Sequence, residues 1–228
     1  MLKKTDYEKN INQLIIVANE LREHLKEIVF VGGSVVVLLV DDAAAHAARP
    51  TEDVDIVVNV AALKEYYEFE DMLLAKGFIN DTKSDVACRY KKGSIALDVM
   101  TTEEDVLGFT NIWYGPALNC TDTKTLPDGT EIQVISPIYF IATKIEAFKN
   151  RGHGDYLSAD IEDIVAVMEN RGQLLIEMKD ADEDLRQYFV KEYADLDNPD
   201  FWNHVPGCLD NPDNEFVITN AFKFITSL

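Results

Sequence analysis

The sequence has few cysteines, few positive charges and no long apolar segment. Its three cysteines, Cys88, Cys120 and Cys208, lie far apart and are odd in number, and its four histidines form no metal-ligand spacing. This pattern fits neither a disulfide framework nor a zinc site. We therefore expect free thiols in a reducing compartment, which indicates a cytoplasmic protein.

Long apolar segments are missing as well. A membrane-spanning helix needs about 18 consecutive apolar residues. The longest candidate, residues 28–40, is shorter and contains two glycines. Residues 1–8 carry no apolar core of the kind that a secretion signal has. We expect neither export nor a membrane partner.

Positive charge is scarce, since 41 Asp and Glu residues outnumber 21 Lys and Arg residues and give a formal net charge of −20. Extensive DNA binding needs clustered lysines and arginines that neutralise phosphates, so we do not expect it. A local basic patch for one RNA end, a cationic small molecule and a basic protein partner all remain compatible with this balance. The acidity can also serve solubility alone.

The apolar periodicity that is present predicts an α+β fold in two parts. Residues 1–135 are predicted to form an α/β domain, with helices at 7–25, 34–48 and 63–76 and strands at 27–31, 54–60, 86–90, 94–100 and 133–135. Residues 136–228 are predicted to form a helical domain. Its expected helices are 138–150, 159–170, one or two within 173–193, and 215–226, with Ser136 and Ser158 as N-caps.

Two aspartates one residue apart, Asp53 and Asp55, stand at the start of a predicted strand. Residues at this spacing on a strand point to the same side. Two carboxylates held so close repel and raise each other's pKa, and a hard divalent cation such as Mg²⁺ relieves that conflict. Upstream, the turn Gly32-Gly33-Ser34 offers backbone N–H groups with no Cβ in the way, which suits a polyphosphate.

These two motifs together resemble the signature of the DNA polymerase β-like nucleotidyltransferase superfamily. In that family a strand leads into a Gly-Gly-Ser turn that opens a helix, and a later strand carries Asp-x-Asp. Residues 28–35 and 51–56 follow this order. The resemblance implies a minimal nucleotidyltransferase fold, in which helices flank a mixed β-sheet, an NTP substrate and a two-metal Mg²⁺ site.

A two-metal site needs about three carboxylates, and Asp98 is the best candidate for the third. It lies between Leu97 and Val99 on an otherwise apolar predicted strand. In the resembled family the third acidic residue lies on such a later strand, and Asp98 matches it by context. The alternative is an aspartate on the solvent face of an edge strand.

The second half carries a further resemblance, to the abortive-infection (AbiEii-type) nucleotidyltransferase toxins. In those proteins a lysine helix is followed by an arginine and then by a Lys-Asp-x-x-Asp run. Here Lys144, Arg151, Asp160 and Asp163 follow this order, and Ala159 replaces the second lysine. The resemblance implies that Lys144 carries positive charge to the triphosphate. Asp160 and Asp163, on one helical face, would hold Lys144 or Arg151 or contact nucleotide or acceptor; the alternative is a surface salt bridge.

The sequence therefore predicts a Mg²⁺-dependent nucleotidyltransferase that moves a nucleoside monophosphate from an NTP to an acceptor hydroxyl. The metal ligands would be Asp53, Asp55 and Asp98, and Asp98 would help to deprotonate the hydroxyl. The candidate nucleotide-binding residues are Gly32, Gly33, Ser34, Arg49, Thr51, Lys144, Asp160 and Asp163. Arg49 is equally compatible with a surface arginine.

Several readings of the acceptor and the function stay open. The toxin resemblance favours an RNA end or a protein as acceptor and an antitoxin protein as a partner. The acidic composition favours a cationic small molecule, as in aminoglycoside-modifying members of the superfamily. A binding module with an impaired site is one alternative. A metal-dependent phosphohydrolase is another, although it leaves Gly32 and Gly33 unexplained.

Overall fold

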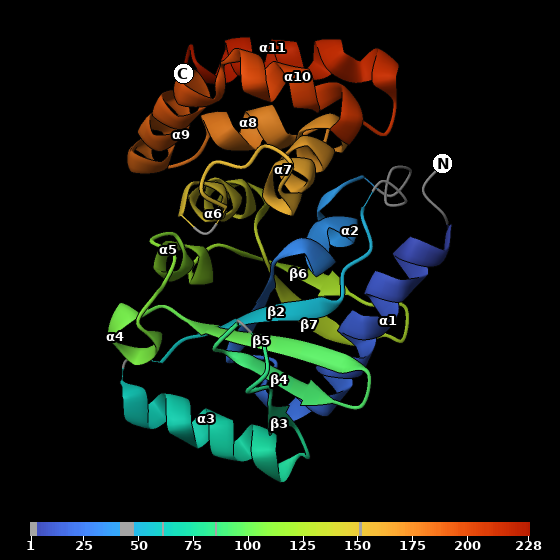
Figure 1. Cartoon of the computed structure of the whole chain (residues 1–228), viewed down its shortest axis with the longest axis vertical. Coiled ribbons are helices and arrows are strands. Elements are labelled where there is room, and N and C mark those ends of the chain that lie inside the picture. The colour runs from blue at the N-terminus through green and yellow to red at the C-terminus, as the bar shows by residue number, and fades with distance from the viewer. Residues whose placement is uncertain (1–3, 42–47, 61, 85, 151) are drawn as a thin grey trace.

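A seven-stranded mixed sheet organises the first part of the chain (Figure 1). The computed structural model describes residues 4–41, 48–60, 62–84, 86–150 and 152–228. The strands are β1 Ile28–Val31, β2 Asp53–Val58, β3 Ile79–Asn80, β4 Arg89–Lys92, β5 Ile95–Thr101, β6 Thr121–Thr125 and β7 Glu131–Ile135. Their spatial order is β3-β4-β5-β2-β1-β7-β6. The pairs β2–β5 and β1–β7 are parallel and the others are antiparallel.

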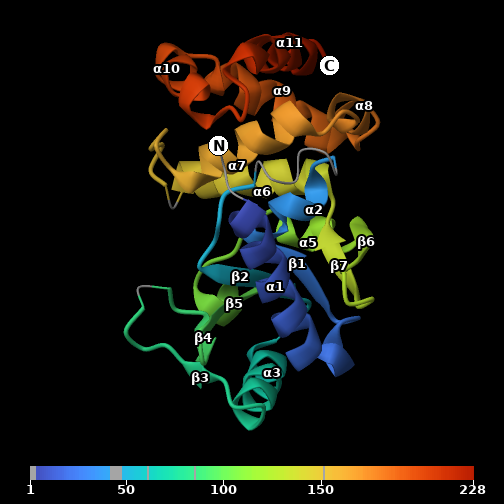
Figure 2. The same cartoon turned by 90° about the vertical axis from the view of Figure 1, so that its right-hand side faces the viewer.

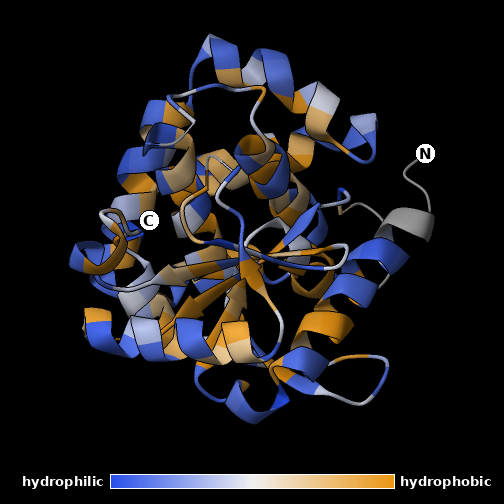
Figure 3. Cartoon of the chain, turned by 60° about the horizontal axis from the view of Figure 1, so that its bottom comes forward, coloured by the Kyte–Doolittle hydropathy of each residue, from blue (hydrophilic) through white to orange (hydrophobic). Residues whose placement is uncertain are grey.

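Apolar, mostly β-branched residues place β1, β2 and β5 at the centre of the sheet. All four residues of β1 are buried, as are Val54 and Ile56 on β2. Figure 3 shows these strands as an apolar interior beneath helices with hydrophilic outer faces. A central position matters for the site, because it holds any polar side chain on these strands in a fixed place.

Helices cover the sheet, and in the described residues from Pro137 onward they are not followed by further strands. The α-helices are α1 Lys4–Glu20, α2 Val36–Leu39, α3 Leu63–Ala75, α4 Glu104–Leu107, α5 Tyr114–Leu118, α6 Pro137–Asn150, α7 Ala159–Asn170, α8 Leu174–Lys179, α9 Glu183–Leu196, α10 Pro199–Cys208 and α11 Glu215–Ile225. Short 3-10 helices η1, η2 and η4 span Arg22–His24, Gly33–Val35 and Pro212–Asn214. In Figures 1 and 2, α6 and α7 lie between the sheet and α8–α11.

The predicted α+β fold class is confirmed, with a mixed sheet flanked by helices and a helical C-terminal part. One cluster of buried apolar side chains includes residues from both parts, among them Phe30 and Phe140. The division at residue 135 therefore stays a prediction. Cys88, Cys120 and Cys208 form no disulfide, as expected. No helix in the described part of the chain is long and apolar enough to cross a membrane.

The helix predicted at 34–48 is confirmed for residues 34–39 and is wrong at residues 40 and 41. The chain makes one 3-10 turn, Gly33–Val35, then the single short helix α2, and Val40 is already extended. The three valines at 35–37 explain the early end, because β-branched side chains lose χ1 freedom in a helix. The alanines at 43–45 lie outside the described residues.

Other elements also differ from the predictions. Strand β6 and helices α4, α5 and α10 were not predicted, since β6 is polar throughout and α10 contains Pro206. The first helix ends at Glu20 rather than at Leu25. The hydroxyls of Ser136 and Ser158 have no hydrogen-bond partner among the described residues, so neither caps its helix by its side chain.

Candidate active site

The turn after β1 is the first component of the candidate site. Gly32 has a φ of +70°, a backbone conformation that residues with a Cβ rarely adopt. A Cβ on Gly32 would lie 1.9 Å from Oδ2 of Asp55, and one on Gly33 would lie 2.6 Å from Nη2 of Arg49. The two glycines therefore allow a carboxylate and a guanidinium to approach the backbone closely.

The second component is a row of residues that crosses four strands side by side. Val31 of β1 pairs with Asp55 of β2, Asp55 pairs with Asp98 of β5, and Asp98 pairs with Arg89 of β4. Asp53 lies two residues before Asp55 and so shares its face. The predicted convergence of Asp55 with Asp98 beside the glycine turn is thus present in the strand register.

Asp98 is not on the solvent face of an edge strand. Strand β5 lies between β4 and β2, and Asp98 is only 5% exposed. Asp53 and Asp55 are half-buried. A buried carboxylate needs a partner, and the strand pairing supplies one that the sequence reasoning missed.

That partner is Arg89, whose guanidinium lies across two of the three carboxylates. Its Nε donates to Oδ1 of Asp98 and its Nη2 to Oδ2, both at 2.7 Å. The same Nη2 also donates to Oδ2 of Asp53. These hydrogen bonds to Asp98 raise the pKa of Arg89 above its ordinary value, against the opposing effect of burial. Arg89 falls in a predicted strand, but no local pattern indicates the register that sets it opposite Asp98.

A second charged cluster joins the segment before β2 to helices α6 and α7. Nζ of Lys144 lies 3.0 Å from Oδ1 of Asp160 and 2.7 Å from Oδ2 of Asp163. Nε of Arg49 donates to Oδ1 of Asp163 at 2.8 Å and its Nη2 to Oδ2 at 3.1 Å. We call these four residues, Arg49, Lys144, Asp160 and Asp163, the inter-helix clasp.

The clasp is buried and electrically balanced. Lys144, Asp160 and Asp163 are 6%, 4% and 1% exposed, so the surface salt bridge considered for the aspartates is wrong. Burial alone would lower the pKa of Lys144, but the charges of Asp163 and Asp160 offset it and leave that pKa raised. The predicted contact of both aspartates with Lys144 is present. Arg151, the other predicted partner, lies outside the described residues.

Two further candidates lie beneath the site rather than at its surface. Thr51 is 2% exposed; its backbone N–H donates to Oδ1 of Asn10 and its hydroxyl to the carbonyl of Asp53. Ser34 is fully buried, and its hydroxyl has no partner among the described residues. Thr51 thus fixes the approach to β2, and a phosphate contact by either residue stays a prediction.

We call Asp53, Asp55 and Asp98 the carboxylate row. A cavity of about 490 Å³ borders the glycine turn, the carboxylate row and the clasp. The acidic residues that line its described part are Glu52, Asp53, Asp55, Asp98 and Asp160, and the basic ones are Arg49, Arg89 and Lys144. Five carboxylates against three basic side chains give the lining a formal surplus of two negative charges. The lining therefore favours the binding of a cation. The Gly32–Gly33 turn borders the same cavity.

Comparisons with known proteins support the fold. No protein-family model and no curated protein matches the sequence. Among solved structures, the chain is similar to an antigenic nucleotidyltransferase-like protein from Paracoccidioides brasiliensis, with a TM-score of 0.56 and 17% sequence identity. The match covers 95% of this chain and 93% of that one. The chain has a nucleotidyltransferase-like fold.

Proposed function

We propose that this protein is a nucleotidyltransferase that depends on a divalent metal ion. One observation carries the proposal: Asp53, Asp55 and Asp98 lie on neighbouring strands, beside the Gly32–Gly33 turn and around one cavity. Nucleotidyl transfer requires an aligned phosphate and neutralised charge more than it requires a covalent intermediate. A glycine turn and a set of carboxylates are suited to those two requirements.

The donor atoms fit Mg²⁺ in kind. Carboxylate oxygens are the ligands that this ion prefers, and the closeness of Asp55 to the turn leaves no room for a Cβ on Gly32. Asp53, Asp55 and Asp98 would hold the ion, which would neutralise phosphate charge when bound. Among the described residues, no three Asp, Glu, His or Cys side chains are arranged so that they could hold a metal ion without moving.

The chain's own residues would perform the remaining work. Backbone N–H groups of Gly32 and Gly33 would face the phosphates. The acceptor oxygen would bond to the α-phosphorus while the bond from that phosphorus to the bridging oxygen breaks, and pyrophosphate would leave. The proton of the acceptor hydroxyl would pass to a carboxylate, for which Asp98 is our candidate. The clasp would fix Lys144 and Arg49 at the cavity wall.

The test measures pyrophosphate release from each of the four NTPs with Mg²⁺, in the presence of cell lysate as a pool of acceptors. We expect release by the wild type and its loss, by about 1,000-fold, in Asp55→Asn, because a lost metal ligand costs several kcal/mol of transition-state stabilisation. Asp184→Asn on α9 is the matched control, since Asp184 is exposed and does not line the cavity. Equal rates in the wild type and Asp55→Asn would refute the proposal.

We further propose that the acceptor is an RNA end, a protein or a cationic small molecule, and that the chain acts as a toxin of the AbiEii type with an antitoxin partner. The order of Lys144, Asp160 and Asp163 supports the toxin class, and the two surplus negative charges of the cavity lining support a cationic acceptor. Mass spectrometry of RNA, protein and small molecules after expression would find added nucleotide mass in one pool. Growth arrest that Asp55→Asn abolishes would support a toxin, and normal growth would contradict it.

A binding module of the same fold is the second candidate, favoured by the guanidinium of Arg89 that lies across Asp53 and Asp98. It predicts nucleotide binding with no turnover in any acceptor pool. Calorimetry with each NTP, run beside the pyrophosphate assay, separates the two functions. Binding together with turnover would exclude the module.

A further inference from the structure

We propose that Arg89 is a resident cation of the carboxylate row, and that a divalent metal ion binds Asp98 only after displacing it. This inference rests on the proposed function and concerns the same site. It starts from the contacts of one guanidinium with two carboxylates on different strands, β2 and β5. It assigns to Arg89 a positioning role that follows from neither the Asp-x-Asp pattern nor the glycine turn.

The contacts engage both oxygens of Asp98. Each accepts a hydrogen bond of 2.7 Å from the fork of the Arg89 side chain, a bidentate geometry that is among the strongest between side chains. A metal ion bound to those oxygens would lie beside a fixed positive charge, and like charges at such a distance repel strongly in a partly buried site. Arg89 and a metal ion at Asp98 therefore compete.

The same contacts accompany an arrangement in which no three acidic, histidine or cysteine side chains of the described residues are grouped as metal ligands. Asp53 and Asp98 each contact Arg89, so its guanidinium draws them toward itself rather than toward a common centre with Asp55. Strand register already sets Asp55 opposite Asp98. Only the side chains must rearrange to bring three carboxylates around one ion.

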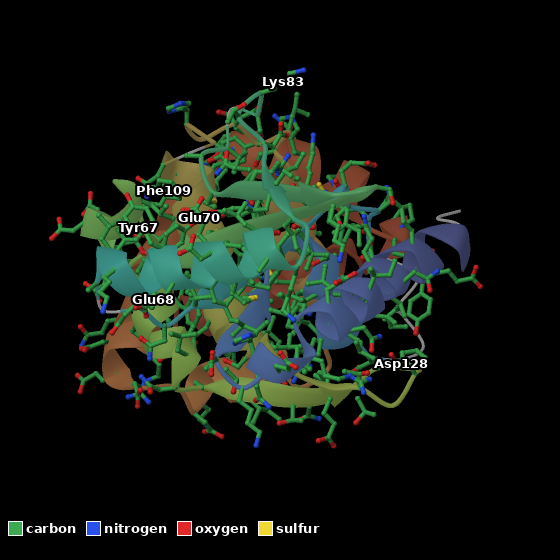
Figure 4. All side chains as sticks on the ribbon, turned by 90° about the horizontal axis from the view of Figure 1, so that it is seen from below. Tyr67, Glu68, Glu70, Lys83, Phe109 and Asp128 are labelled. Carbon is green, nitrogen blue, oxygen red and sulfur yellow. The ribbon has the colours of Figure 1, made fainter. Side chains whose placement is uncertain are left out.

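Arg89 has room for this rearrangement. Its side chain is 20% exposed and lines the cavity, so the displaced guanidinium need not enter the core. It stands at the start of β4, next to the outermost strand β3 and directly after the segment between them, which extends away from the sheet in Figure 2. Figure 4 places Lys83 of that segment at the outer edge of the molecule.

A displaced Arg89 would remain in the cavity, where the phosphates of an NTP are its next partner. Asp98 would then exchange a guanidinium for a metal ion, and Arg89 would exchange carboxylates for phosphate. We call the conformation in which Arg89 no longer contacts Asp53 and Asp98 the released state. Metal and nucleotide would both favour this state, so each would strengthen the binding of the other. Without nucleotide, Arg89 would stay bound to Asp53 and Asp98, and the affinity of the site for the metal ion would be low.

The test titrates Mn²⁺ as the probe into metal-stripped protein and follows the signal of free Mn²⁺ by electron paramagnetic resonance. If the released state is about 1–10% populated, Arg89→Gln should bind Mn²⁺ about 10- to 100-fold more tightly than the wild type. The same variant should bind the Mn²⁺–NTP complex with less gain from the nucleotide. Arg22→Gln, at an exposed arginine of η1, is the matched control and should behave as the wild type.

A purely structural arginine gives a different result, since its loss would loosen the row and weaken Mn²⁺ binding. Equal or weaker binding by Arg89→Gln overturns the inference and leaves the proposed metal dependence in place. Absence of Mn²⁺ binding by every variant, together with absence of turnover, overturns both. Arg89→Lys keeps one charge without the fork, and we expect its affinity to fall between those of the wild type and Arg89→Gln.

A measurement on the wild type keeps the inference testable even if Arg89→Gln fails to fold. Phenylglyoxal modifies accessible guanidinium groups, and peptide mass spectrometry gives the rate at each arginine. We expect Mn²⁺ to raise the modification rate of Arg89 severalfold and to leave that of Arg22 unchanged. A rate at Arg89 that falls or stays constant on addition of Mn²⁺ contradicts displacement.

Discussion

The carboxylate row and the inter-helix clasp contain the same residue types in different proportions. The row sets Asp53, Asp55 and Asp98 against one arginine, whereas the clasp sets Asp160 and Asp163 against Arg49 and Lys144. Both clusters border the cavity, but the formal charges of the clasp balance and three of its four residues are buried, whereas the three carboxylates of the row face one arginine. Balance suits a structural contact, while surplus charge at a cavity suits the binding of a cation.

The comparison also bears on the role that the sequence context of Lys144 implies. Its ammonium group contacts two buried aspartates, and the formal charges of the four clasp residues sum to zero. Its position at the cavity wall is nevertheless fixed by those contacts. Its contribution to the binding of a triphosphate stays a prediction.

The largest effect is expected from Asp163→Ala, which breaks the clasp. The change leaves the charges of Lys144 and Arg49 without their shared partner, and Asp163 is 1% exposed. Loss of one partner of a buried ion pair costs about 3–5 kcal/mol in the free energy of unfolding. Urea denaturation followed by circular dichroism measures it.

The control for this variant is Glu68→Ala on α3, which breaks the exposed pair with Lys64 and leaves the residues that line the cavity unchanged. An exposed pair contributes about 0–1 kcal/mol. If Asp163→Ala costs no more than Glu68→Ala, the clasp is not a structural contact and the contrast between the two clusters fails.

A smaller effect is expected when the row loses its arginine. Arg89→Gln removes hydrogen bonds to charged groups and should cost about 1–3 kcal/mol in metal-free buffer. Mn²⁺ at about 100 times its dissociation constant returns about 2.7 kcal/mol. In thermal unfolding, Mn²⁺ should therefore raise the Tm of Arg89→Gln more than that of the wild type.

The clasp variant Asp163→Ala tests whether the effect of Mn²⁺ is specific to the carboxylate row. Asp163→Ala keeps Asp53, Asp55, Asp98 and Arg89, so Mn²⁺ should raise its Tm only as much as it raises that of the wild type. A larger rise for Asp163→Ala than for Arg89→Gln would mean that the metal acts at the clasp instead, and would reverse the roles given to the two clusters.

The parts of the site that the sequence predicted depend on short spacings. Asp53 and Asp55 share a face because a strand repeats every two residues, and Asp160 and Asp163 share one because helix neighbours lie three apart. Asp98 was matched by its context in the resembled family, and its place opposite Asp55 also required the observed register of β2 with β5. The fold class followed from the same periodicities, with the strands ending before the helical C-terminal part.

What the sequence could not predict depends on long-range register and packing. Arg89 meets Asp98 only because β4 pairs with β5 in one register, and a shift by one residue would turn Arg89 to the other face. Arg49 meets Asp163 across 114 positions in the chain. Nothing local indicates either contact. The short α2 shows the reverse case, in which the glycine turn correctly indicates that a helix opens, but not that it ends at Leu39.

The smallest effect is expected at Gly33, which lies against the clasp and follows Gly32, the glycine that lies against Asp55. A Cβ there would lie 2.6 Å from Nη2 of Arg49 and 3.1 Å from Oδ2 of Asp163, so Gly33→Ala must push the clasp aside. Overpacking of this kind costs about 1–2 kcal/mol. Gly115→Ala is the control, because a Cβ at this α5 position meets nothing within 4 Å, and alanine there should stabilise the protein by about 0.5–1 kcal/mol.

A double-mutant cycle decides whether the cost at Gly33 arises from the clasp. In an Arg49→Ala background the nearest atom is gone, so Gly33→Ala should cost less there than in the wild type, and the two changes should not add. Strict additivity in urea denaturation would show that the strain lies in the turn itself. The turn would then position Asp55 and the carboxylate row without any help from the clasp.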